Sequence, residues 1–72
     1  MGSDTEWLRI DASCARFFRI GEDVIAGEML GVNVYGGIVK ASSNGRVVQI
    51  QYDIDSNEII VAVAPFQYSA AA

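Results

Sequence analysis

Histidine is absent from this 72-residue chain, and cysteine occurs only once, as Cys14. The lack of histidine removes the commonest general base, the commonest zinc ligand and every Ser-His or Cys-His dyad. A single cysteine excludes an intramolecular disulfide framework and is typical of a reducing compartment. We therefore expect no enzymatic activity, no metal site and no cofactor, and we expect Cys14 to be a buried, inert thiol.

Positive charge is also scarce, since five Lys and Arg residues stand against nine Asp and Glu residues, for a net charge of −4. Nucleic-acid binding needs a basic surface that displaces counterions, so we expect no nucleic-acid partner. No apolar run has the length of a membrane span, and no basic-then-apolar leader opens the chain. The sequence therefore predicts a cytoplasmic protein without a membrane span.

Apolar residues are abundant at 51%, whereas charged residues make up only 19%. This balance predicts an ordered chain, and the length allows one domain with a small core. We expect a single β domain over residues 7–66, with frayed or added ends at residues 1–6 and 67–72. The high apolar content also favours exposed apolar area at a partner interface, with a homodimer as the expected assembly.

Short extended segments follow one another with turn signals between them, which predicts an all-β fold of six to seven short strands. Strands are expected at residues 7–10, 15–20, 28–35, 38–41, 46–54 and 59–64, and a helix over 11–20 is the competing prediction for the second segment. In segment 15–20, Phe18 and Ile20 share a face. In segment 46–54, alternation places Val48, Ile50, Tyr52 and Ile54 on one face and the residues between them on the other.

Glycines set the predicted turns. Gly21 and Gly27 bound a compact turn in which both take a positive φ, and Val24 and Ile25 fold back under it. Gly36-Gly37 turns the chain again, and Asn44-Gly45 favours a type I′ hairpin turn with positive φ at both residues. Residues 55–58 form a polar hairpin loop. The last strand is apolar on both faces and ends at Pro65, which predicts a central position in the sheet.

Two motifs in residues 21–47 resemble the biotinyl/lipoyl-type barrel-sandwich hybrid superfamily. The first is Gly-x-x-Val-x-x-Gly-x-x-Leu-Gly, and the second is Val-x-Ala-Pro-x-(Asp/Asn)-Gly-x-Val with Ser42 in place of the proline; the matching residues are Gly21, Val24, Gly27, Leu30, Gly31, Val39, Ala41, Asn44, Gly45 and Val47. The resemblance implies a small barrel-sandwich hybrid. Residues 53–59 lack the glycine turn that this family repeats, so the second half is degenerate.

The family's attachment lysine has no counterpart here. It lies on a hairpin between the two motifs, whereas residues 32–38 contain no lysine and the only lysine of the chain, Lys40, falls beside the second motif. The leading hypothesis is therefore a non-catalytic interaction or scaffold module that acts through a protein partner or self-association. One alternative is a carrier domain modified at Lys40, which is the only candidate cofactor-binding residue.

A second alternative is a small-molecule-binding β-barrel that uses an aromatic surface of Tyr35, Tyr52, Phe66 and Tyr68. Acidic residues supply two further candidates. The order Asp53, Asp55, Asn57 is similar to the first ligands of a calcium loop, but the expected glycine and final glutamate are missing. The pairs Glu22-Asp23 and Asp53-Asp55 lie in predicted turns, where we expect solvated, ionised carboxylates without acid/base function.

Overall fold

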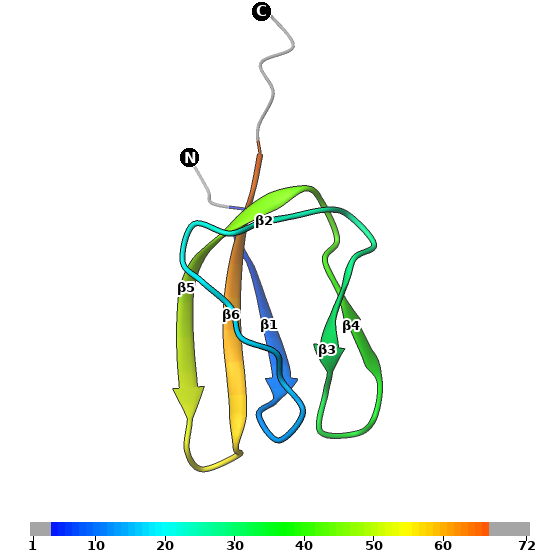
Figure 1. Cartoon of the computed structure of the whole chain (residues 1–72), viewed down its shortest axis with the longest axis vertical. Coiled ribbons are helices and arrows are strands. Elements are labelled where there is room, and N and C mark those ends of the chain that lie inside the picture. The colour runs from blue at the N-terminus through cyan, green and yellow to red at the C-terminus, as the bar shows by residue number, and fades with distance from the viewer. Residues whose placement is uncertain (1–3, 67–72) are drawn as a thin grey trace, which may run out of the picture.

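The computed structural model describes residues 4–66, and within this range the fold is all-β without a helix. These residues form six strands, in the order β1 (Glu6–Asp11), β2 (Asp23–Val24), β3 (Met29–Val32), β4 (Ile38–Lys40), β5 (Gly45–Asp53) and β6 (Glu58–Pro65) (Figure 1). The predicted all-β fold of six to seven short strands is confirmed. Of the two predicted tails, only residues 4–6 lie within the described range, and Glu6 already belongs to β1.

Four of the strands form a curled antiparallel sheet in the order β1-β6-β5-β2, and β3 and β4 pair as a separate hairpin. Strand β6 lies inside the larger sheet, where it pairs with β1 on one side and β5 on the other. Its residues Val61, Ala62 and Val63 are almost fully buried. The predicted central position of the last strand is therefore confirmed.

The core lies between the larger sheet and the elements that close over it. The β3–β4 hairpin contacts β1, as Figure 1 shows on the side of the sheet away from β5. The buried cluster contains apolar side chains from five of the six strands, from the segment before β2 and from the residue after β4; its members are Ile10, Phe18, Val24, Leu30, Ala41, Val47, Val61 and Val63. Because this core is small, most of the remaining large apolar side chains stay at the surface.

The glycine-bounded turn has the predicted backbone geometry. Gly21 and Gly27 have φ of 91° and 85°, which only glycine adopts without a Cβ penalty. Val24 is buried under the turn, as predicted, whereas Ile25 is 65% exposed, so the inward prediction is wrong for Ile25. The cause is the short β2, which pairs Val24 with Gly45 and points the next side chain away from the core.

Asn44-Gly45 does not form a type I′ hairpin turn, and this prediction is wrong. Neither residue is among those with a positive φ, and Gly45 is the first residue of β5. The Asn44 side-chain oxygen accepts a hydrogen bond from the Ala26 N–H at 2.8 Å. A Cβ at Gly45 would lie 2.5 Å from the Ala64 carbonyl oxygen, so glycine is needed here for the close approach of β5 to β6.

A β-bulge at Val48 overturns the predicted facing of β5. Val47 pairs with Val63 and Gln49 with Ala62, so Val48 is the extra residue between them. Val47 is fully buried while Val48 is 46% exposed, the reverse of what unbroken alternation predicts. The bulge shifts the side-chain period by one residue and puts Val47 and Ile50 on the core side together.

Residues 15–20 are neither strand nor helix, so both predictions for this segment are wrong. The segment crosses the open face of the larger sheet from the end of β1 to the start of β2 (Figure 1). A chain that runs across strands instead of beside one has no neighbour for a backbone ladder. Phe18 is buried beneath the Arg16 guanidinium, 4.1 Å from the ring centroid, whereas Ile20 is 62% exposed, so the two do not share an environment.

Candidate interaction surface

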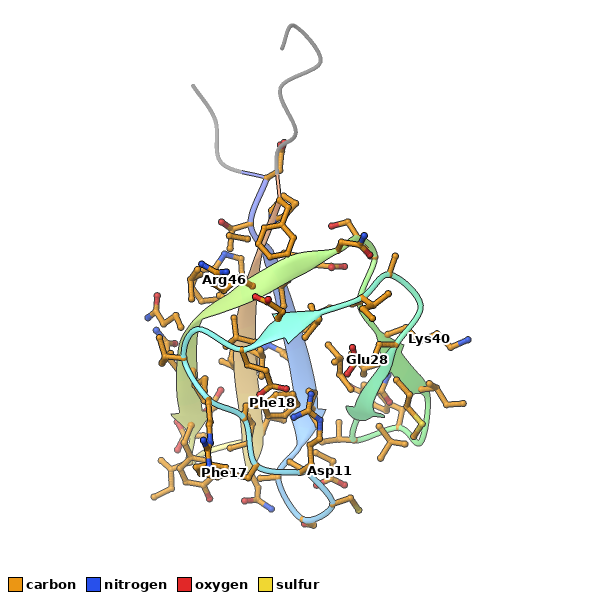
Figure 2. All side chains as sticks on the ribbon, turned by 45° about the horizontal axis from the view of Figure 1, so that its top comes forward. Asp11, Phe17, Phe18, Glu28, Lys40 and Arg46 are labelled. Carbon is orange, nitrogen blue, oxygen red and sulfur yellow. The ribbon has the colours of Figure 1, made fainter. Side chains whose placement is uncertain are left out.

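Lys40 is the last residue of β4 and is exposed (Figure 2). It pairs across the hairpin with Met29, at the end of the hairpin remote from its turn. That turn is formed by residues 33–37, where Gly36 has φ of 85° and the Asn33 N–H donates to the Gly37 carbonyl at 2.8 Å. The most exposed side chain of the hairpin turn is Tyr35. Lys40 is therefore not at the tip of the hairpin, where Tyr35 lies.

The acid-rich loop between β5 and β6 is held by an arginine from β1. Arg9 binds Asp53 at 3.3 Å and Glu58 at 2.8 Å, and Glu58 is buried on the outer side of the sheet. The Arg9 guanidinium holds the pKa of Asp53 below its usual range. Among residues 4–66 no group of three or more candidate metal ligands is found. Arg9 thus engages the first carboxylate of the calcium-like order and the glutamate that follows it.

Glu22 and Asp23 are paired with arginines. Arg16 lies 2.8 Å from Glu22, and Arg46 lies 3.0 Å from Asp23. The hydrogen bond from Arg16, aided by the Arg19 N–H, lowers the pKa of the Glu22 carboxyl. A general acid at neutral pH needs the opposite shift. Cys14 lies in an exposed turn after β1, so the prediction of a buried thiol is wrong.

The proposed aromatic surface does not assemble as one patch. Tyr35 lies in the β3–β4 turn and Tyr52 lies on β5, and Figure 1 shows these two elements on opposite sides of the molecule. Phe66 is half-buried beside the Arg46 guanidinium, and Tyr68 lies outside the described residues. No pocket is found in the part of the chain that the structure describes. The described aromatic residues therefore form no joint site for a small molecule.

The outer edge of β5 is open over most of its length. Strand β2 pairs only with Gly45 and Arg46, and Gly21 and Glu22 bond the backbone of Val47. Beyond Val47, residues 48–53 have no strand on that side among residues 4–66. Unpaired N–H and C=O groups along a strand edge are a template for another strand.

Exposed apolar side chains lie along the same edge. They come from β5, from the residue after it and from the crossing segment: Val48, Tyr52, Ile54, Phe17 and Ile20, with exposed fractions of 46, 56, 76, 78 and 62%. Figure 2 shows Phe17 on the side of the molecule where β5 ends. The sequence pattern did not identify this surface, because it assigned residues 15–20 to a strand in which Ile20 shares a face with Phe18 and Phe17 lies on the opposite face.

The outer face of the sheet carries both polar and apolar side chains where β5 and β1 flank β6. Cross-strand pairing sets Gln49 and Trp7 on either side of Ala62, and Gln51 and Arg9 on either side of Ile60. Trp7 is 52% exposed in this row. Thus β5 presents amide side chains on its outer face and apolar side chains on its core side, while its backbone edge is open.

No helix within residues 4–66 has the length and apolarity to cross a membrane. Comparison with protein-family models, with curated proteins and with solved structures gave no match to this chain.

Proposed function

We propose that this chain is a non-catalytic interaction module that acts through a protein partner or through self-association. The observation that carries the proposal is the share of large apolar side chains at the surface. Eleven of them are exposed within residues 4–66, whereas seven are buried there, because two of the nine buried hydrophobic residues are the alanines Ala41 and Ala62. Monomeric soluble proteins rarely expose extended apolar patches, and such patches mark interaction sites.

The ionisable groups support the same proposal. The ion pairs of Arg9, Arg16 and Arg46 join different segments of the fold and engage five acidic side chains, of which Glu58 is buried. Carboxylates engaged in this way hold parts of the fold together.

Photo-crosslinking tests the proposal. A photoreactive phenylalanine analogue is placed at Phe17, Ile25 or Tyr35, which are exposed and apolar, or at the exposed polar control position Asp4. We expect protein adducts, either to a second copy or to another protein, at the apolar positions and few at Asp4. If no apolar position gives an adduct above the Asp4 control, the proposal is wrong.

The carrier hypothesis remains a second candidate because Lys40 is exposed and therefore accessible to a modifying enzyme. Co-expression with a biotin or lipoate ligase and measurement of the intact mass distinguishes it from the first proposal. The carrier hypothesis predicts a mass increase that disappears in Lys40→Arg. The interaction module predicts an unmodified mass in both chains.

A further inference from the structure

The free edge of β5 has a self-complementary sequence. In residues 48–54, apolar side chains at Val48, Ile50, Tyr52 and Ile54 alternate without a break with polar ones at Gln49, Gln51 and Asp53. Natural edge strands are protected by lysine, proline, bulges or short length. Here the bulge lies only at Val48, and the five residues from Gln49 to Asp53 pair regularly with β6. The edge is therefore straight enough to accept another strand.

We propose that a second copy of this chain pairs antiparallel with β5 about a two-fold axis at Gln51. This inference rests on the proposed function and names its partner and its surface. In this register Ile50 lies opposite Tyr52 of the second copy on both sides of the axis. This pair joins two apolar side chains, and aromatic–β-branched pairs of this kind stabilise antiparallel sheets. Gln51 lies opposite the same residue of the second copy.

The charges on the edge fit this register. Asp53 is the only charged side chain of residues 48–54, and it lies opposite Gln49 of the second copy. An amide can donate to that carboxylate, whereas two like charges directly opposite each other would destabilise the pair. The carboxylate of Asp53 is already neutralised in part by Arg9 at 3.3 Å. The interface thus forms without bringing together like charges of a chain whose net charge is −4.

Neighbouring registers fit less well. An axis at Ile50 would bring Asp53 of the second copy beside Val47, whose N–H and C=O are already bonded to Glu22 and Gly21. An axis at Tyr52 would leave only residues 51–53 of both strands in contact, because the chain turns at residues 54–57. An axis midway between residues 50 and 51, or between 51 and 52, would place Asp53 opposite Val48 or Ile50 of the second copy. A charged side chain would then face an apolar one. The axis at Gln51 uses all of residues 49–53, the part of the free edge that pairs regularly with β6.

The available area is adequate for a specific dimer. An aromatic side chain carries roughly 150–250 Å², so Phe17 and Tyr52, at 78 and 56% exposure, together offer on the order of 250 Å². A standard interface buries about 800 Å² on each partner. The two aromatics supply about a third of this, and the strand backbone and the exposed Ile20, Val48 and Ile54 add to it.

Two matched charge variants test the dimer. Gln51→Lys places two like charges opposite each other at the axis, whereas Gln49→Lys places a positive charge opposite Asp53 of the second copy. Gln49 and Gln51 are both exposed and face the same side of the sheet. Each substitution changes the net charge by the same amount. Sedimentation equilibrium of the full chain should show a dimer that weakens at least tenfold in Gln51→Lys and does not weaken in Gln49→Lys. Circular dichroism checks that each variant folds.

A disulfide trap reports the register directly, in a Cys14→Ser background because Cys14 is exposed. In Gln51→Cys the two engineered residues are directly opposite, with Cα atoms about 4.5–5.5 Å apart, which suits a disulfide. In the control Gln49→Cys they are separated by four residues along the strands, roughly 13 Å, which is too far. We expect a cross-linked dimer after oxidation only in the first variant.

Three results would overturn the inference: a monomer at the highest concentration, equal weakening in both lysine variants, or equal disulfide formation in both cysteine variants. The trap decides the case in which Gln51→Lys does not fold. If the full chain is monomeric yet the photo-crosslinks join it to another protein, this inference fails while the proposed function stands. If no crosslinks form and the chain is also monomeric, both fail.

Discussion

Substitution of Gly45 by alanine tests why glycine is required where β5 begins. The added Cβ would lie 2.5 Å from the Ala64 carbonyl oxygen and 2.8 Å from the Val63 Cγ1. The first contact is with backbone, so relief needs β5 and β6 to separate where the two strands are paired. Overpacking of this kind costs about 1–3 kcal/mol, while the loss of glycine's freedom in the unfolded chain returns about 0.4–1 kcal/mol.

The overpacking cost should lie near the upper end of that range, about 3 kcal/mol, because backbone cannot rotate away. After the opposing gain of about 0.4–1 kcal/mol, we expect the free energy of unfolding to fall by about 2 kcal/mol in Gly45→Ala. With a urea dependence of about 1 kcal/mol per molar for so small a domain, the midpoint moves down by about 2 M. Urea titration followed by circular dichroism measures this shift. The protein is kept dilute so that association does not contribute.

Gly36→Ala is the matched control, because Gly36 has φ of 85° and a Cβ there meets no atom within 4 Å. Its expected cost is only that of the left-handed backbone, about 1 kcal/mol. A type I′ turn at Asn44-Gly45 would make the two glycines equivalent, since both would be required for positive φ alone. A cost for Gly45→Ala equal to or below that of Gly36→Ala would therefore refute the close-approach explanation.

Two further predictions concern the core and the ion pairs. Leu30→Ala removes a side chain that is 2% exposed, so it should lower the free energy of unfolding by about 2–5 kcal/mol, and a loss below about 1 kcal/mol in thermal or urea unfolding would contradict the core assignment. Glu22→Gln removes the pair with Arg16 that lowers the pKa of Glu22. Because the folded pKa lies below the unfolded one, the pair stabilises the fold above the ordinary carboxyl pKa, and this stability is lost as pH falls through the lowered pKa. At neutral pH the free energy of unfolding of the wild-type chain should exceed that of Glu22→Gln by less than about 1 kcal/mol, and this difference should disappear in acid. A difference in the free energy of unfolding that does not change with pH would contradict the ion-pair explanation.

The sequence determined the β fold because its signals act locally. Alternating side chains in β1 and β5, the continuous apolar run of β6 and the polar loop between β5 and β6 each predict their element from a few neighbouring residues. Gly21 and Gly27 predicted positive φ because no other residue adopts it as readily. The absence of histidine likewise excludes imidazole chemistry in any fold, because a side chain that the chain lacks cannot be supplied by packing.

Tertiary structure decided what depends on distant neighbours. Gly45 has no positive φ, and it is glycine because β6 approaches it closely. The bulge at Val48 reverses the facing of Val47, and no local signal marks an extra residue in a ladder. Residues 15–20 have strand-like side chains but cross the sheet, so Phe17 is left at the surface. The open edge of β5 likewise results from the shortness of β2, which is set by how the chain packs and not by the residues of β5 themselves.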